Sequence, residues 1–187
     1  NKKLAPPQVA AEILKKMNRL HTKQEYINLI DNIRKIIPNC GISHDMIAGF
    51  PSETEDDHRE TLDLMNYVKY DFGFMFSYSE RPGTLAAKKI KDDVPNQIKK
   101  KRLQEIISLQ QKHSKIRTEQ YINQTVCVLI EKESKKSKNH WSGRTTQNTV
   151  VVFPKENYMI GDFVDVKIIN STSATLIGNA LNHSKTL

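Results

Sequence analysis

Residues 42–57 constrain the fold of this 187-residue chain more than any other stretch. The apolar run 46–48 suits a buried strand, and Gly49 and Pro51 then stop it. Ser52 or Thr54 can cap a following helix whose first turn is acidic, as the positive end of a helix favours. The pattern predicts a strand–loop–helix unit of a parallel α/β sheet, in which ligands bind at the carboxyl ends of strands. Any α/β unit needs such punctuation, so a segment without a ligand fits it as well.

Two further segments occur downstream and give three motifs in a fixed order. The motifs are Ser-x-Asp-x-Ile-x-Gly-Phe-Pro-x-Glu-Thr-Glu at 43–55, Phe-Ser-Tyr-Ser-Glu-Arg-Pro-Gly-Thr-Leu-Ala at 76–86, and Gly-Arg-Thr-x-x-Asn-x-x-Val-x-Phe at 143–153. Together they resemble the radical SAM methylthiotransferase family, and the resemblance covers about residues 13–181. The most similar branch methylthiates an isopentenyl-type adenosine beside the tRNA anticodon. The resemblance implies that this chain is only the C-terminal part of such a protein.

The resemblance also implies S-adenosyl-L-methionine (SAM) and two 4Fe-4S clusters as cofactors of the full-length parent. The two cysteines, Cys40 and Cys127, lie far apart and in no metal-ligand spacing. A cluster normally takes three or four thiolates. We therefore expect this fragment to hold none of these cofactors alone, and to be inactive alone. Both cysteines are predicted to be ordinary buried thiols; no catalytic or metal-binding residue is assigned.

Four residues match family positions near the SAM pocket. They are Arg19, Asp45, Ile47 and Gly49. Judged from the residues alone, Arg19 fits a solvated helix end, Ile47 fits plain core, and Asp45 fits a hydrogen-bond acceptor behind the pocket. The family's Pro-x-Gln-Ser-Gly-Ser loop reads Pro-Pro-Gln-Val-Ala-Ala at 6–11 here, so part of the implied SAM contact differs.

Residues 1–118 are predicted to form the C-terminal portion of a radical SAM partial (β/α) barrel. Helices are expected at 22–37 and 54–69, with His58 on the acidic surface of the second. The strand 72–79 alternates with period two, and its aromatic stripe is expected to be core under a helix layer. Its smaller side chains would then line a barrel interior.

Two further basic features are candidates for anion binding. Arg81 follows the aromatic strand in a polar turn, where it could bind a phosphate, a carboxylate or RNA, or pair with Glu80. A long helix is predicted from a cap at 92–95 to about residue 120. Its cluster 99–102 fits phosphate contact, and it equally fits a solvated helix face.

Residues 119–187 are predicted to be a small antiparallel β-barrel, because four period-two runs begin at 125, 149, 163 and 174. The motif at 143–153 resembles the TRAM domain, an RNA-binding barrel of tRNA-modifying enzymes. The residues expected to bind RNA are Lys132, Lys135, Lys136, Trp141 and Arg144, together with Arg81 outside the barrel. The loop 134–139 is expected to carry the lysines, and the alternative is a solvated loop with Trp141 plugging the barrel end.

The net charge of +8 and pI of about 9.4 favour an acidic partner such as nucleic acid. We therefore expect a tRNA anticodon stem-loop as partner, besides the missing N-terminal part of the same protein. No apolar stretch reaches the ~20 residues of a membrane span, and a cytoplasmic location is expected. Oligomeric state is not readable from the sequence. Three alternatives stay open: a fragment acting on an aspartate of a ribosomal protein, one acting on threonylcarbamoyl adenosine, and a stand-alone TRAM-type RNA-binding module.

Overall fold

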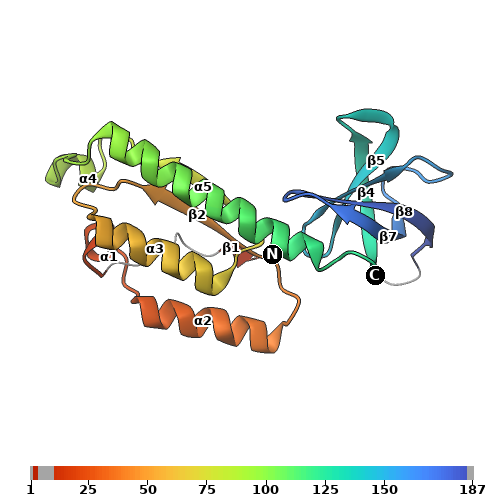
Figure 1. The fold of residues 1–187 in the computed structure, drawn as a ribbon, viewed down its shortest axis with the longest axis horizontal. Coiled ribbons are helices and arrows are strands. Elements are labelled where there is room, and N and C mark those ends of the chain that lie inside the picture. The colour runs from red at the N-terminus through yellow and green to blue at the C-terminus, as the bar shows by residue number, and fades with distance from the viewer. Residues whose placement is uncertain (1, 4–10, 185–187) are drawn as a thin grey trace. The chain divides into compact units, whose positions relative to one another are not determined.

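The computed structural model describes residues 2–3 and 11–184, and the chain divides into two compact units at residues 111 and 112 (Figure 1). The first unit combines helices with a parallel sheet, and the second contains a β-barrel. Helix α5, Asn96–Glu119, runs through the division. Its start and end agree with the long helix predicted from the sequence.

The α/β unit contains a three-stranded parallel sheet in the order β1-β2-β3. The strands are β1 Lys2–Lys3, β2 Ile42–Ala48 and β3 Phe72–Ser77. The helices are α1 Ala11–Lys16, α2 Lys23–Ile36, α3 Glu55–Val68 and α4 Leu85–Lys89. Strand β1 was not predicted, because two residues are too short for a periodic pattern.

Capping boxes begin the two longer helices before α5. The Thr22 side chain accepts from the Glu25 N–H, and the Glu25 side chain accepts from the Thr22 N–H, as predicted. Thr54 and Asp57 repeat this reciprocal arrangement at α3. Each box satisfies N–H groups that have no partner inside the helix, so the sequence fixes both starts.

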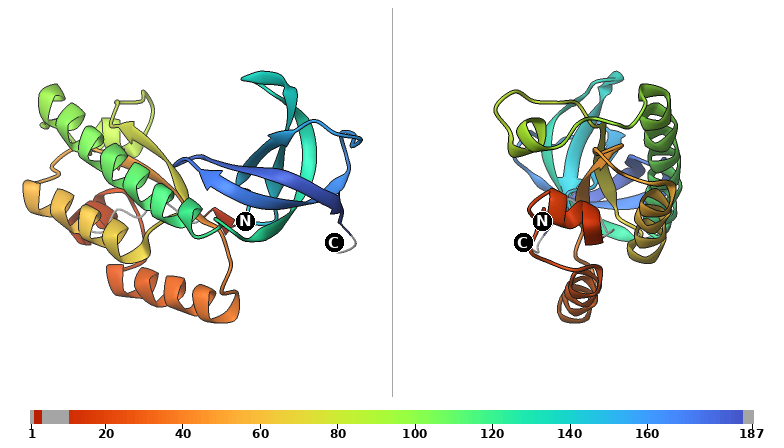
Figure 2. Two further views of the ribbon diagram at one scale, coloured as in Figure 1. Left: turned by 45° about the vertical axis from the view of Figure 1, so that its right-hand side comes forward. Right: turned by 90° about the vertical axis from the view of Figure 1, so that its left-hand side faces the viewer.

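The main core of this unit lies between one face of the sheet and the helices. Helices α3 and α5 lie side by side over this face (Figures 1 and 2). The buried residues are Tyr26, Ile30, Ile42, Met46, Ala48, Leu64, Met65, Val68, Tyr70 and Ile106. Alternate residues of β2 therefore point away from the helices, and Ile47 is one of these.

The predicted orientation of β3 is wrong. Phe74 and Phe76 are each 54% exposed, whereas Met75 packs against the main core. The period of two is correct, but the helices cover the face of the smaller side chains. Periodicity shows that a strand has two faces, and it does not show which face the helices cover.

The buried side of α5 carries polar groups that bond to the sheet. The Gln110 amide lies 2.8 Å from His44 Nε2 through its oxygen, and its nitrogen donates to the Tyr70 carbonyl at 3.0 Å. The Tyr70 hydroxyl in turn lies 3.0 Å from that of Tyr26, and burial raises the pKa of Tyr70 well above its usual range. These bonds specify how the helix packs, because buried polar groups are costly when unpaired.

Replacing Gln110 with Leu should lower the free energy of unfolding of the α/β unit by about 1–2 kcal/mol, because the Tyr70 carbonyl and the His44 ring lose a buried partner. Urea denaturation followed by circular dichroism measures this change. Gln104→Leu, on the exposed side of the same helix, is the matched control. Equal stability of both variants would show that the buried amide contributes nothing.

The second unit contains a closed barrel with strand order β4-β5-β6-β8-β7. Its strands are β4 Thr125–Ser134, β5 Ser137–Thr145, β6 Val150–Pro154, β7 Phe163–Ser171 and β8 Thr175–His183. All pairs are antiparallel except β6 with β8, which is parallel. Inward-facing side chains such as Val128, Val151 and Phe153 form the buried core of the barrel.

The predicted loop at 134–139 is wrong. Strand β4 extends to Ser134 and β5 begins at Ser137, so only Lys135 and Lys136 form the turn. Strand β5 was missed because polar residues occupy most of its positions and give no apolar alternation. It is instead held by pairing with β4 on one side and β6 on the other.

Candidate cofactor pocket and nucleic-acid interface

Two adjoining clefts lie at the carboxyl ends of β2 and β3 in the α/β unit. Their volumes are about 440 and 730 Å³, and they share Ile47, Thr84 and Ala86 as lining residues. The position fits the rule that α/β sheets bind ligands beyond the carboxyl ends of their strands.

Arg19 and Ile47, which the family resemblance implied near the SAM pocket, both line the larger cleft. Four basic side chains border it. They are Lys15, Lys16, Arg19 and Lys89. Phe50 and Ile90 supply apolar surface, and Phe50 packs on Ile13 in a small core of its own. The cleft therefore offers an apolar surface beside positive charge.

Asp45 and Gly49 are placed differently. Asp45 lies two residues before Ile47 on β2, opposite Phe74 of β3, and so shares the sheet face that points away from the helices. Gly49 has a φ of +73°, and a Cβ there would lie 2.3 Å from the Cγ atom of Lys99. The positive φ and the packed Lys99 side chain together favour glycine at this position.

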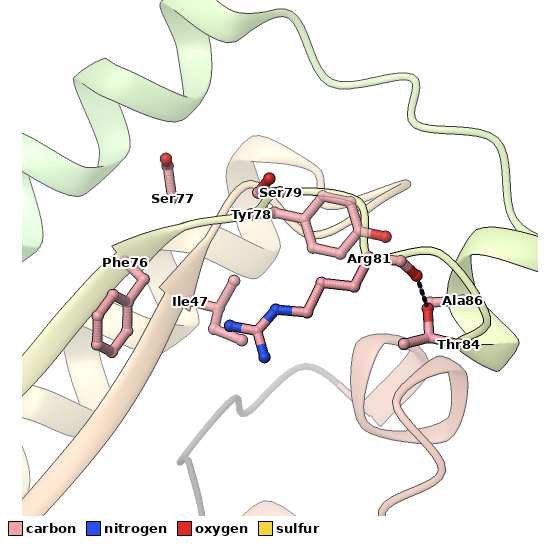
Figure 3. A pocket seen from close by; sticks show the side chains of 8 residues that line it. All are labelled: Ile47, Phe76, Ser77, Tyr78, Ser79, Arg81, Thr84 and Ala86. Carbon is pink, nitrogen blue, oxygen red and sulfur yellow. Dashed lines mark hydrogen bonds between the residues drawn. The ribbon is translucent and has the colours of Figure 1, made fainter.

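Arg81 lines the smaller cleft, and its side chain extends from the loop after β3 back toward Ile47 (Figure 3). The Thr84 hydroxyl donates to the Arg81 carbonyl at 2.9 Å and also caps α4. The exposed guanidinium is thus anchored through its backbone.

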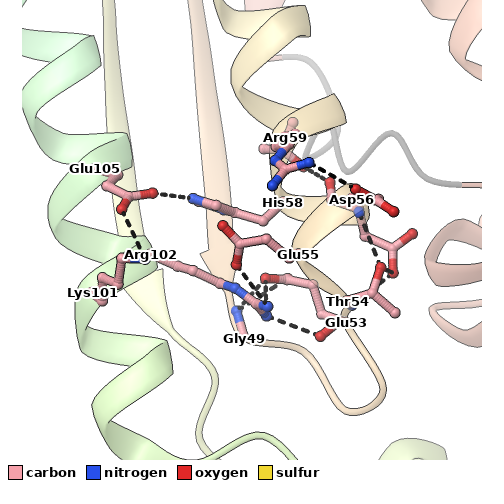
Figure 4. Close-up of polar contacts among 12 residues, drawn as sticks. Gly49, Glu53, Thr54, Glu55, Asp56, His58, Arg59, Lys101, Arg102 and Glu105 are labelled. Atoms are coloured by element: carbon pink, nitrogen blue, oxygen red, sulfur yellow. Dashed lines mark hydrogen bonds and ion pairs between the residues drawn. The ribbon is translucent and has the colours of Figure 1, made fainter.

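A buried ion-pair network holds the loop after β2 (Figure 4). Both Glu53 carboxylate oxygens accept from the Gly49 N–H at 3.1 Å, and Arg102 donates to Glu53 Oε1 at 3.1 Å. Arg102 also donates to the Glu53 carbonyl at 2.9 Å and to Glu55 at 3.4 Å. Burial raises the pKa of Glu53, while the Gly49 N–H and Arg102 oppose that rise. The network fixes the backbone that borders the cleft.

This network corrects two predictions. His58 is 1% exposed rather than on the surface, and its Nε2 lies 2.7 Å from Glu105 Oε2. Lys99 and Arg102 are 3% and 5% exposed, and Lys99 pairs with Asp92. Lys99 and Arg102 therefore cannot bind phosphates, because both are buried and already paired with carboxylates of the same unit.

A groove of about 470 Å³ crosses the outside of the barrel. The strand register aligns Lys132, Ser142, Val152 and Ile177 in one row across β4, β5, β6 and β8. The neighbouring row contains Arg144, Val150 and Thr175. All seven line the groove, together with Lys135, Lys136 and His140. Of the RNA-binding residues predicted for the barrel, the groove therefore brings together Lys132, Lys135, Lys136 and Arg144.

Arg144 is held by its own turn. Its Nη1 donates to the Asn148 carbonyl at 2.9 Å and to Asn148 Oδ1 at 3.0 Å, and its Nε lies 3.3 Å from Glu131. The Thr145 hydroxyl accepts from the Thr149 N–H at 3.2 Å. The Gly-Arg-Thr-x-x-Asn motif thus forms the end of β5 and the turn to β6, and the Arg144 side chain is 38% exposed at the groove.

Trp141 lies in β5 rather than in a loop, and it is only 9% exposed. Its ring belongs to the barrel core, and Lys155 Nζ lies 4.3 Å from the ring centroid. Lys155 also pairs with Glu133, whose pKa it lowers. The ring packs on the barrel as the alternative interpretation expected, but Trp141 lies in a strand and not in the solvated loop that this interpretation assumed.

The sequence interpretation missed the apolar part of the groove. Val150, Val152 and Ile177 point outward from β6 and β8 and are half-buried. Their signal was present, because each stands at an alternate position to a fully buried neighbour in runs that are apolar on both faces.

The described residues contain no group of three or more histidine, cysteine or acidic side chains that could hold a metal ion. Cys40 and Cys127 are half-buried and belong to different units, so the expectation of buried thiols is wrong for both. Among the described helices, none is long and apolar enough to cross a membrane.

Comparison with known proteins gives two results. The model of the TRAM domain matches residues 119–181. A tRNA-2-methylthio-N(6)-dimethylallyladenosine synthase of Christiangramia forsetii is 69% identical over 172 residues, which is 92% of this chain and 36% of that protein. Over 92% of its length the chain is thus similar to part of this synthase, and it contains a match to the TRAM domain.

Two further curated proteins match over a similar length. The synthases of the same name from Flavobacterium psychrophilum and Chloroherpeton thalassium are 64% and 53% identical, each over 92% of this chain. They are covered to 36% and 38% of their own length. The chain thus spans little more than a third of the length of these curated relatives.

Proposed function

We propose that this chain is part of a tRNA methylthiotransferase that adds a methylthio group to C2 of N6-isopentenyladenosine next to the anticodon. The barrel groove carries this proposal, because it combines three lysines, an arginine and an apolar surface on one face. Nucleic-acid sites combine cations for phosphates with surfaces for bases. The relatives named for this reaction support the proposal.

Residues 1–118 would then be the C-terminal portion of a radical SAM partial barrel, and residues 119–187 the RNA-binding part. The three parallel strands and their helices are compatible with a piece of such a barrel. A tRNA substrate would place the enzyme in the cytoplasm.

The larger cleft of the α/β unit fits SAM by the chemistry of its lining. Ile47 offers apolar surface for an adenine ring, and Arg19 offers a cation for a carboxylate. Asp45 and Gly49 would stand beside SAM only by the family resemblance, because neither lines this cleft and the Cβ side of Gly49 is filled by Lys99. When bound, SAM supplies the radical and the methyl group. The iron–sulfur clusters do not fit this chain, because two distant cysteines cannot supply three or four thiolates.

Replacing Lys132, Lys135 and Lys136 together with Ala should weaken binding of an anticodon stem-loop RNA by about 10- to 100-fold at low salt, because each lysine is expected to neutralise one phosphate. The slope of log K against log salt should become shallower by about one per lost contact. Fluorescence anisotropy across a salt series measures both quantities.

A matched control removes three exposed lysines of the other unit, Lys35, Lys88 and Lys91, and so keeps the change in net charge. If this control weakens binding as much as the groove variant, the interaction is general electrostatics. If the stem-loop binds no better than an unrelated hairpin, the tRNA proposal fails, and a protein substrate becomes the better hypothesis.

A further inference from the structure

An apolar patch on the outside of the barrel has no evident structural role. Val150, Val152 and Ile177 are all half-buried residues of the groove, while the barrel interior is filled by a separate set of fully buried side chains. Outward positions of a barrel are usually polar, and apolar patches with a polar rim mark interaction sites.

The rim of the groove is cationic. Lys132, Lys135 and Lys136 are exposed, and the one acidic residue of the lining, Glu131, already pairs with Arg144. Lys132 stands in the same register row as Val152 and Ile177, so positive charge and apolar surface are next to each other across the sheet. An occupant must therefore combine an apolar face with neighbouring negative charges.

We propose that this groove receives one unstacked nucleobase of the bound RNA, laid on Val150, Val152 and Ile177, with the flanking phosphates on Lys132 and the turn at Lys135–Lys136. The proposal rests on the proposed RNA-binding function and names the part of the RNA that the groove takes. A base in a duplex is stacked on both sides and has no free face, so the occupant is a single-stranded loop nucleotide.

A peptide strand is a poorer occupant. Extended peptides bind by adding a strand to a free sheet edge, and the five described strands close into a barrel in which each has two partners. The polar groups beside the apolar patch, His140 and Ser142, instead lie where they could meet the edge of a base. His140 is oriented by Ser137, whose hydroxyl lies 2.9 Å from its Nδ1.

The test combines removal of single bases with removal of the apolar surface. A fluorescent anticodon stem-loop is prepared with an abasic site at each loop position in turn, and each RNA is titrated with the unmodified chain and with Ile177→Ala. The matched control is Ile169→Ala, which removes an exposed isoleucine from β7 outside the groove. Thermal unfolding confirms that both variants keep the barrel.

We expect one loop position at which loss of the base weakens binding by about 5- to 10-fold, the low end of what a base stacked on an aromatic ring contributes, because aliphatic side chains take the place of the ring. Ile177→Ala should cause a similar loss with the intact RNA and no additional loss with that abasic RNA, whereas Ile169→Ala should behave as the unmodified chain. Such non-additivity is the signature of direct contact between two groups.

Two results overturn the proposal while the proposed function survives. The stem-loop binds tightly and with steep salt dependence but no abasic position matters, or the Ile177→Ala loss is the same with every RNA. If the intact stem-loop binds no better than an unrelated hairpin, the proposed function fails and the groove proposal fails with it.

Discussion

The α/β unit should lose about 3–5 kcal/mol of unfolding free energy when Arg102 is replaced by Gln, because the change leaves the Glu53 carboxylate buried without its cation. Both side chains of this pair are only 6% exposed, so water cannot replace the guanidinium. The Glu53 carbonyl loses its donor as well, and Glu55 loses a neighbour. Urea denaturation at pH 7, followed by circular dichroism, measures the loss.

The loss should depend on pH. Burial already raises the pKa of Glu53 above 4.5, and removing Arg102 raises the pKa further. The native state then binds more protons than the unfolded state between pH 4.5 and the new pKa, so the unfolding free energy falls as pH rises through this window. Lowering the pH from about 7 to about 5 should therefore recover part of the stability that Arg102→Gln lost.

Arg59→Gln is the matched control, since Arg59 pairs only with Asp56 on the surface of α3, with side chains 68% and 88% exposed. Exposed pairs contribute about 0–1 kcal/mol, so this variant should remain close to the unmodified chain at both pH values. Equal effects of the two substitutions would contradict the assigned role of Arg102, as would a loss that grows on acidification.

The barrel should lose about 2–3 kcal/mol when Gly143 is replaced by Ala, the upper part of the range for overpacking. A Cβ at this position would lie 2.3 Å from the Leu129 carbonyl oxygen and 2.6 Å from Val128 Cγ1. Because the first contact is with backbone of the paired strand β4, no side-chain rotation can relieve it. Thermal unfolding should show a lower midpoint for the barrel.

Gly161→Ala separates this clash from the conformational cost of losing a glycine. Gly161 has a φ of +99° but open space around the position of a Cβ, so only the backbone penalty applies. We expect this control to lose about 1 kcal/mol. If Gly143→Ala is no more destabilising than Gly161→Ala, strands β4 and β5 can move apart at little cost, and the glycine of the motif needs another explanation.

Local chemistry in the sequence predicted helices and several strands well, and long-range packing decided what it missed. The starts of α2 and α3 could be read from Thr22 and Thr54, because each caps its helix by accepting a hydrogen bond from a backbone N–H three residues later. His58 was misplaced because its partner, Glu105, is 47 residues away in the sequence. The same limit applies to the aromatic face of β3, since helices from elsewhere in the chain decide which face is covered.

The candidate sites show the same division. The family resemblance implied one site for Arg19 and Ile47, and both line the larger cleft. No local sequence pattern connects two residues so far apart. The burial of two cations in the cluster 99–102 was missed because charge alone does not reveal burial. Arg102 pairs with Glu53 and Glu55, which are distant from it in the sequence. The apolar part of the groove was missed because it needs the register of four strands at once.

The parallel pairing of β6 with β8 has a consequence for the order in which the barrel is made. Ile177 and Thr175 reach the groove only when β8 has paired beside β6, and the barrel closes only when β7 has paired with β4. The ribosome therefore synthesises the lysines of the β4–β5 hairpin before the β8 part of the groove, Thr175 and Ile177, has been made. Contacts this distant in sequence form slowly. A nascent chain with only β4, β5 and β6 would display the cations beside Val150 and Val152 but without Ile177, so the surface for a base would be incomplete.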